Sequence, residues 1–380
     1  MLSKLTQLFK SADAPAADSG GEAELLDAVQ ALVDPDTGRT YAEAKAIRNV
    51  RQSASAIGLD IVLAYPAQSR HDTIRAQFAE ALATLAGTRQ IDIAVSSQIT
   101  GHAVQRGIPL LPGVKNVIAV ASGKGGVGKS TTTVNLALAL AAEGARVGIL
   151  DADIYGPSQP LMMGLQGQRP ASPDNKSLVP VENYGVQTMS MGYLVDDDQA
   201  MVWRGPMVTQ ALMQLLNDTR WDALDYLLID LPPGTGDVQL TLSQKIPVTG
   251  AVIVTTPQDI ALLDAKKGLR MFEKVGVPVL GIVENMSVHI CSNCGHVEAI
   301  FGEGGGQKMA EQYNVELIGQ LPLDLSIRLA VDEGRPSVIA DPDGTIAAIY
   351  KQIARRVAVK VGEKARDYSS RLPKIVVQNT

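Results

Sequence analysis

A glycine-rich run at residues 123–131 constrains the fold of this chain more than any other feature. It reads Gly-Lys-Gly-Gly-Val-Gly-Lys-Ser-Thr and lies between an apolar stretch at 117–121 and a helix-forming stretch at 132–140. Glycine has no Cβ, so backbone N–H groups can turn toward phosphate oxygens at the start of the following helix. The pattern of buried strand, glycine loop and helix predicts a phosphate-binding loop in an α/β, doubly wound, mostly parallel sheet.

The loop carries two lysines, and the motif assigns them different tasks. In the frame Gly-x-x-x-x-Gly-Lys-Ser/Thr, Lys129 reaches the β- and γ-phosphates and Ser130 ligates Mg²⁺. Lys124 is an additional cation at the start of the loop, where it can reach a nucleotide held across a dimer interface. We expect ATP to be bound by Gly123, Lys124, Gly125, Gly126, Val127, Gly128, Lys129, Ser130 and Thr131.

Aspartates follow two further predicted strands. Asp151 and Asp153 come directly after the strand at 146–150, and Asp230 ends the strand at 226–230. Because ligands bind at the carboxyl ends of parallel strands, we expect these carboxylates to lie near the loop. Asp151 and Asp153 are predicted to hold waters of Mg²⁺ or to orient the attacking water, and Asp230 to hold Mg²⁺ through a water. The predicted catalytic residues are Lys124, Lys129, Asp151 and Asp153.

The pattern of elements divides the chain into five parts. They are a disordered segment at 1–21, a small α+β domain at 22–105, a linker at 106–113, the nucleotide domain at 114–345, and a C-terminal helix and tail at 346–380. In the small domain, apolar spacing predicts a helix over 25–33, alternation predicts strands at 57–63 and 91–95, and Asp72 is predicted to cap a helix over 72–85. In the tail, the spacing of Ile353, Val357 and Val361 predicts a helix packed on the nucleotide domain.

Cys291 and Cys294 are the only cysteines, and their Cys-x-x-Cys spacing lets two thiolates bind one metal centre. Three uses stay open from the residues alone. One is structural zinc with His289 and His296 as extra ligands, one is an iron–sulfur cluster shared by two chains, and one is a redox dithiol.

Composition excludes several classes of protein. The net charge of −6 argues against a nucleic-acid-binding surface, and no apolar run reaches the ~20 residues of a membrane span. Residues 1–10 carry no cleavage site, so we do not expect a secretory signal; a frayed terminus or a short amphipathic contact are the alternatives. Two cysteines cannot form a disulfide framework, so we expect a cytoplasmic protein.

The loop at 123–131 resembles the deviant Walker A loop of the MinD/ParA/nitrogenase iron-protein class of dimeric ATPases. The runs 151–158, 230–237 and 284–287 resemble the Mrp/ApbC family of iron–sulfur cluster carriers, and the resemblance covers residues 114–345. It implies a homodimeric ATPase in which Lys124 contacts the nucleotide of the partner subunit and Asn285 recognises adenine. It also implies that Cys291 and Cys294 of two subunits bridge a [4Fe–4S] cluster, which passes from an assembly scaffold to apo iron–sulfur proteins.

Residues 22–105 resemble the PaaD-like assembly domain that often precedes such ATPases. Those domains often carry a cysteine where this chain has Gln68, so a thiol-dependent role is not expected here. Because residues 22–105 contain no cysteine and no evident catalytic cluster, we predict a docking role for them. Two other functions remain open: a positioning ATPase like MinD, and a zinc-stapled, ATP-dependent switch protein.

Overall fold

The computed structural model describes residues 19–105, 108–195 and 205–364. The chain folds into two compact units. One contains the chain up to Leu63 together with Arg70–Ser96, and the other contains Ala64–Ser69 together with the chain from Ser97 onward. The expected tail beyond 364, the first residues of the expected linker, and the expected terminal segment up to residue 18 lie outside the described residues.

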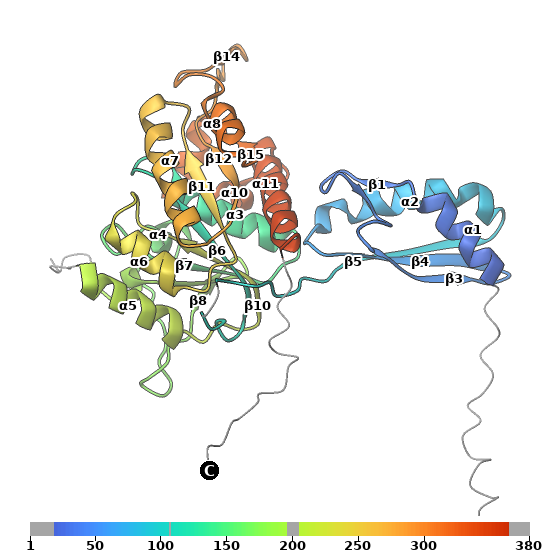
Figure 1. Ribbon diagram of the computed structural model, residues 1–380, viewed down its shortest axis with the longest axis horizontal. Helices are drawn as coiled ribbons and strands as arrows, with labels where there is room; N and C mark the ends of the chain where they lie inside the picture. The colour runs from blue at the N-terminus through green and yellow to red at the C-terminus, as the bar shows by residue number, and fades with distance from the viewer. Residues whose placement is uncertain (1–18, 106–107, 196–204, 365–380) are drawn as a thin grey trace, which may run out of the picture. The chain divides into compact units, whose positions relative to one another are not determined.

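The smaller unit is a three-stranded sheet covered on one face by two helices (Figure 1), in the strand order β3-β4-β5. Its elements are α1 (Ser19–Val29), β1 (Val33–Asp34), β2 (Arg39–Thr40), β3 (Ile47–Gln52), β4 (Ala56–Leu63), α2 (His71–Ala86) and β5 (Gln90–Ser97). The alternating apolar side chains of β4 are buried, as predicted, and so is the stripe Ile74, Phe78 and Leu82 of α2. The sheet and helices therefore share one core.

Three expectations for this unit are wrong. Residues 19–21 lie in helix α1 and are not disordered. That helix ends at Val29, and Val33 begins strand β1. The turn that follows β1 is stabilised by the Asp36 N–H, which donates to Asp34 Oδ1 over 3.0 Å. Asp72 lies inside the first turn of α2, whose N-cap position is Arg70 without a side-chain hydrogen bond.

The larger unit contains an eight-stranded sheet in the order β15-β12-β11-β6-β10-β7-β9-β8. Neighbouring strands are parallel except for β8 and β9. The strands are β6 (Val114–Ala121), β7 (Val147–Asp151), β8 (Val181–Asn183), β9 (Val186–Ser190), β10 (Leu224–Asp230), β11 (Gly250–Thr255), β12 (Val279–Glu284) and β15 (Leu317–Gln320). Strands β6, β10 and β11 are almost entirely buried, as expected for a parallel sheet covered on both faces. The predicted α/β fold class is confirmed.

Helices flank this sheet (Figure 1), and α3 packs against α11 while α7 packs on β11. They are α3 (Lys129–Ala142), α4 (Gln159–Met162), α5 (Gly205–Asp218), α6 (Asp237–Lys245), α7 (Asp259–Lys274), α8 (Gly305–Tyr313), α9 (Leu325–Asp332), α10 (Ser337–Ala340) and α11 (Thr345–Gly362). Ile353, Val357 and Val361 of α11 are buried, which confirms the predicted packing of the tail helix. Within the described parts of the chain, no helix is long and apolar enough to cross a membrane.

Candidate functional site

The glycine-rich run connects β6 to α3 at the carboxyl edge of the parallel sheet. Gly128, at the N-cap of α3, and Gly126 both adopt left-handed backbone conformations, with φ of 80° and 82°. The loop lines a hollow of 290 Å³ together with Asp153, Gly156, Ser158 and Pro233. The loop geometry and the start of α3 therefore form an anion cradle of the kind that phosphate groups occupy.

Packing also demands glycine in this loop. A Cβ on Gly123 would lie 2.1 Å from the backbone carbon of Asp264 in α7, and a Cβ on Gly128 would lie 2.2 Å from Nδ2 of Asn285. Both neighbours come from elements far along the chain. The motif is thus held in place by α7 and by the end of β12.

Lys129 and Asp230 form a buried ion pair beneath the hollow. Lys129 Nζ lies 2.5 Å from Asp230 Oδ1, and the two side chains are 6% and 0% exposed. Lys129 Nζ also donates to Ser130 Oγ over 3.2 Å. The residue predicted for the phosphates, the residue predicted for Mg²⁺ and the strand-end aspartate therefore meet at one place.

The other hydrogen bonds of Asp230 come from neutral side chains. Thr133 Oγ1 donates to Oδ1 over 3.0 Å, and Gln159 Nε2 donates to Oδ2 over 3.0 Å. The sequence analysis missed both residues. The sequence offers only their positions as an indication of this role: Thr133 lies four residues after Lys129 on α3, and Gln159 follows the Asp151–Ser158 run.

Asp151 and Asp153 are only two residues apart, but the structure gives them different environments. Asp151 is 1% exposed and does not line the hollow, and its Oδ2 accepts the backbone N–H groups of Ser158 and Gln159 at 3.0 and 3.1 Å. Burial, and then the Asp230 carboxylate, raise the pKa of Asp151 to about 7. Asp153 lines the hollow, and burial raises its pKa as well. Asp153 is the carboxylate placed to face a bound nucleotide.

Asn285 lies directly behind the loop. Its Nδ2 donates to the Val127 carbonyl over 2.9 Å, and its side chain is 8% exposed. In this arrangement it supports the loop and does not line the hollow. Contact with adenine stays a prediction.

The two cysteines lie on a short hairpin formed by β13 (His289–Ile290) and β14 (Val297–Glu298). The turn is closed by hydrogen bonds from Cys291 N to His296 O over 2.9 Å and from Gly295 N to Cys291 O over 2.8 Å. Cys294 is exposed and Cys291 is half-buried. The backbone N–H groups of Cys294 and Asn293 lower the pKa of Cys291, which favours the thiolate that binds metals.

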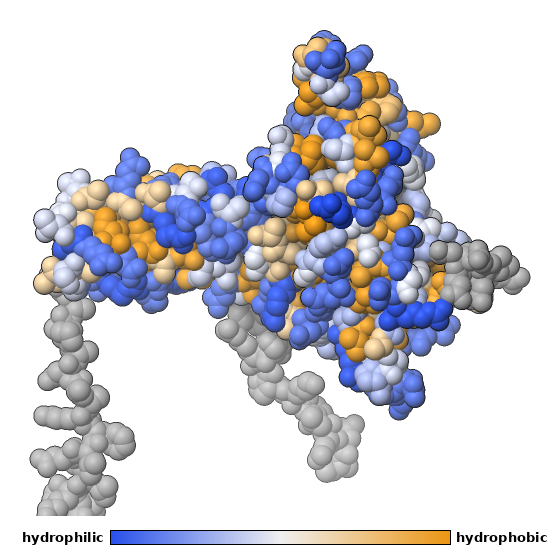
Figure 2. Space-filling view, turned by 180° about the vertical axis from the view of Figure 1, so that it is seen from behind, coloured by the Kyte–Doolittle hydropathy of each residue, from blue (hydrophilic) through white to orange (hydrophobic). Residues whose placement is uncertain are grey.

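Exposed apolar side chains lie close to the cysteine pair in the sequence. Ile290, Val297 and Ile300 are 50, 55 and 50% exposed, and Figure 2 shows hydrophobic and hydrophilic side chains next to one another at this tip of the larger unit. His289 Nδ1 lies 3.1 Å from the Leu323 carbonyl oxygen, and this contact orients the ring. Among the residues that the structure describes, no group of three or more His, Cys, Asp or Glu side chains could hold a metal ion.

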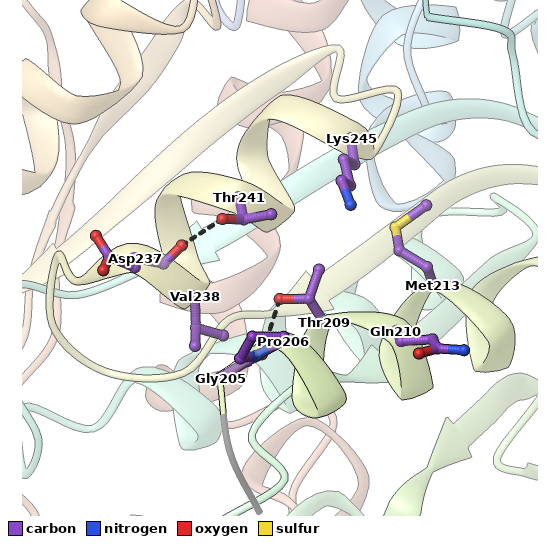
Figure 3. Close-up of a pocket in the computed structure, with 9 residues that line it drawn as sticks. All are labelled: Gly205, Pro206, Thr209, Gln210, Met213, Asp237, Val238, Thr241 and Lys245. Atoms are coloured by element: carbon purple, nitrogen blue, oxygen red, sulfur yellow. Dashed lines mark hydrogen bonds between the residues drawn. The ribbon is translucent and has the colours of Figure 1, made fainter.

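A second hollow lies between α5 and α6 and was not predicted (Figure 3). It has a volume of 830 Å³. The hydroxyl groups of Thr209 and Thr241 donate to the carbonyl oxygens of Gly205 and Asp237. These two hydroxyls are bonded within their own helices, and the other polar side chains that line the hollow are Gln210, Asp237 and Lys245.

A glycine cradle between a buried parallel strand and a helix, with a lysine paired to the aspartate of the neighbouring strand, defines a P-loop NTPase. The chain belongs to the NUBPL iron-transfer P-loop NTPase family, whose model matches residues 113–358. Residues 22–95 match a second model, described as an iron–sulfur cluster assembly protein. The resemblance noted in the sequence is confirmed.

Proteins with similar sequences carry names that agree with this family. An iron–sulfur cluster carrier protein of Escherichia coli (strain K12) is 57% identical over 83% of this chain and 86% of its own length. The iron–sulfur cluster transfer protein NUBPL of Mus musculus is 54% identical over 67% of this chain and 81% of its own length. A nucleotide-binding protein from Archaeoglobus fulgidus, solved with ADP, has a TM-score of 0.55 and 40% identity, covering 63% of this chain and 93% of its own.

Proposed function

We propose that this protein is a cytoplasmic, homodimeric ATPase that carries a [4Fe–4S] cluster between two subunits and transfers it to apo iron–sulfur proteins. The nucleotide is ATP with Mg²⁺, and the cluster is cargo. An assembly scaffold supplies the cluster, and recipient apoproteins remove it by ligand exchange. No covalent protein intermediate is needed for that exchange.

The observation that carries this proposal is the exposed cysteine pair. Each chain offers Cys291 and Cys294 on the hairpin, and a four-iron cluster takes four thiolates in most proteins. A twofold dimer presents the same surface from both subunits and so supplies two pairs. Exposure of the hairpin suits a cluster that must reach a recipient protein.

The nucleotide site fits the hydrolytic half of the proposal. Lys129 serves the β- and γ-phosphates, Ser130 binds Mg²⁺, and Asp153 orients the attacking water at the edge of the hollow. Lys124 also lines the hollow, and it acts on the nucleotide of the partner subunit. Since Asp151 is enclosed by backbone N–H groups, it positions the loop that carries Asp153 and does not touch the nucleotide.

ATP and the cluster both lie between subunits in this proposal, so each favours the same dimer. Binding of Mg²⁺-ATP selects one arrangement of the two subunits, and hydrolysis releases it. The cluster is then held firmly in one state and offered to recipients in the other.

Metal analysis after anaerobic reconstitution tests the proposal. We expect about two iron and two sulfide per chain in the wild type, visible absorption from the cluster, and loss of all three in Cys294→Ser. ATP binding should survive in Cys294→Ser, because the nucleotide is bound by other loops. Zinc at one per chain without sulfide would support the zinc-stapled switch, and a cluster retained by Cys294→Ser would exclude the bridging site.

The positioning ATPase is tested by the same preparation. A MinD-like function requires no metal at Cys291 and Cys294. Wild-type protein that hydrolyses ATP but takes up neither iron nor zinc would favour that alternative.

A further inference from the structure

Gln159 lies at the centre of the hydrogen bonds beneath the nucleotide hollow. Its side chain is 0% exposed. Its Nε2 donates to Asp230 Oδ2 over 3.0 Å and to the Ser130 carbonyl oxygen over 3.2 Å. Its backbone N–H donates to Asp151 Oδ2 over 3.1 Å. One residue therefore joins the phosphate loop, the end of β10 and the end of β7.

The orientation of this amide is fixed by its partners. A carboxylate oxygen and a backbone carbonyl oxygen only accept hydrogen bonds, so the nitrogen of Gln159 must face them. The amide oxygen, in turn, has no partner within the described structure. Burying an amide oxygen without a hydrogen bond costs free energy. The two hydrogen bonds of the amide nitrogen, to Asp230 and to the Ser130 carbonyl, offset this cost.

The Asp230 carboxylate that Gln159 holds is also paired with Lys129, whose ammonium group must serve the phosphates as well. Lys129 Nζ neutralises Asp230 over 2.5 Å, and the same Nζ is the group that the phosphates require. When Lys129 turns to a phosphate, Asp230 stays buried without its lysine. Hydrogen bonds from Thr133 and Gln159 then hold its carboxylate in place and satisfy both of its oxygens.

We propose that Gln159 is a positioning residue that holds the Asp230 carboxylate toward Mg²⁺ while Lys129 serves the phosphates. This inference rests on the proposed binding of Mg²⁺-ATP. A neutral amide suits the task because it donates without adding a second cation beneath the phosphates. Gln159 also begins α4 directly after Ser158, which lines the hollow, so the same bond ties Asp230 to the wall of the nucleotide site.

The test compares ATP binding with and without Mg²⁺, by calorimetry on the full-length protein. In Gln159→Leu, which removes the donor but keeps the volume, we expect ATP affinity without Mg²⁺ to change little. The gain in affinity on adding Mg²⁺ should fall by about tenfold, the effect of one hydrogen bond to a charged group. Gln159→Met, with its flexible chain, is measured in parallel, and thermal melting reports whether each variant is folded.

Two comparisons separate positioning from general structural damage. Gln105→Leu removes an amide that bonds the backbone of Ser243 and Val248, and it should leave the effect of Mg²⁺ unchanged. In an Asp230→Asn background, Gln159→Leu should no longer alter the effect of Mg²⁺. A wild-type effect of Mg²⁺ in folded Gln159→Leu or Gln159→Met overturns the inference. Failure of the wild type to bind Mg²⁺-ATP overturns the proposed function instead.

Discussion

Lys129 Nζ lies 2.5 Å from Asp230 Oδ1, and the two side chains form an ion pair that water hardly reaches. The lysine of the phosphate loop is therefore paired with the carboxylate that ends the neighbouring strand β10. In the proposed function, binding of ATP would replace the Asp230 carboxylate by a phosphate at the same ammonium group. Because a buried charge is costly without a partner, this pair also links nucleotide binding to the stability of the fold.

Lys129→Ala is expected to abolish ATP hydrolysis and to weaken nucleotide binding sharply, because no cation remains at the β- and γ-phosphates. It should also lower the free energy of unfolding by about 3–5 kcal/mol, since Asp230 is left buried and unpaired. Denaturant unfolding measures the second effect. Adding Asp230→Asn to Lys129→Ala should restore much of the stability but none of the activity.

The matched control is Lys267→Ala, which breaks the pair with Asp264 where the two side chains are 67% and 28% exposed. That change should cost at most about 1 kcal/mol. A Lys129→Ala protein that hydrolyses ATP at the wild-type rate would show that the phosphate-loop assignment is wrong.

Asp151 should make stability fall as pH rises. Its pKa is raised from 3.8 to about 7 in the folded protein, so the folded state holds a proton that the unfolded state has lost. This contribution is complete below the unfolded pKa and disappears as pH rises through about 7. Relative to Asp151→Asn, the wild type should lose stability between pH 5 and 7, with a slope that approaches about 1.4 kcal/mol per pH unit.

Asp174→Asn is the control for this titration. The Ser177 N–H lowers the pKa of exposed Asp174, so its contribution changes only at acid pH and should be constant between pH 5 and 8. Unfolding by urea at a series of pH values gives both differences. A flat difference between wild type and Asp151→Asn would contradict the raised pKa.

Gly123 and Gly126 should respond differently to alanine. At Gly123 a Cβ meets the backbone of Asp264, whereas at Gly126 there is open space and only the φ of 82° is unfavourable. We expect Gly126→Ala to cost about 1 kcal/mol and Gly123→Ala about 3 kcal/mol or more, because α7 must move. Thermal or denaturant unfolding measures which variant loses more stability. Equal losses in Gly123→Ala and Gly126→Ala would mean that α7 moves aside at little cost.

The sheet was predictable because its strands are short apolar runs separated by helical stretches. The strand predicted at 226–230 lies within β10, and the loop at 123–131 lies where a strand meets a helix. Such signals are local, since burial on both faces leaves few polar residues in a parallel strand. Strand β3 was missed because only two of its six residues are even half-buried.

The site was harder to predict because it depends on contacts between distant segments. Asp151 and Asp153 look equivalent in the sequence, but only Asp153 lines the hollow. The bonds from Gln159 to Asp230 and from Asn285 to Val127 join segments 71 and 158 residues apart. Spacing along the sequence does not predict contacts between such distant residues, so these pairs could be recognised only in the folded structure.

Removal of the smaller domain should leave nucleotide chemistry intact. The two family models match separate segments, 22–95 and 113–358, and both cysteines fall in the second. A chain beginning at Leu111 should bind ATP and the cluster but transfer the cluster poorly to a recipient apoprotein, because docking is lost. Gln68, where related domains often carry a cysteine, is exposed, and Gln68→Ala in the full chain should leave cluster binding unchanged. Loss of ATP hydrolysis in a truncated chain that still melts cooperatively would contradict this division.

Lys124 should act on the nucleotide of the partner subunit. It lines the hollow, but Lys129 is the lysine that lies inside its own site, paired with Asp230. If Lys124 stabilises the transferring phosphate across the dimer, Lys124→Ala should lower the rate of hydrolysis on the order of 10³-fold and leave most of the ATP affinity. Asp153→Ala, which removes the carboxylate for the attacking water, should be inactive for a different reason.

Mixing the two inactive proteins creates heterodimers in which one site has both its own Asp153 and a partner's lysine, so activity should return in part. Steady-state hydrolysis measured over a range of mixing ratios checks this, with each variant mixed with itself as the control. Mixtures that stay as inactive as their components, although exchange of subunits is shown by differently tagged chains, would mean that Lys124 does not act across the dimer.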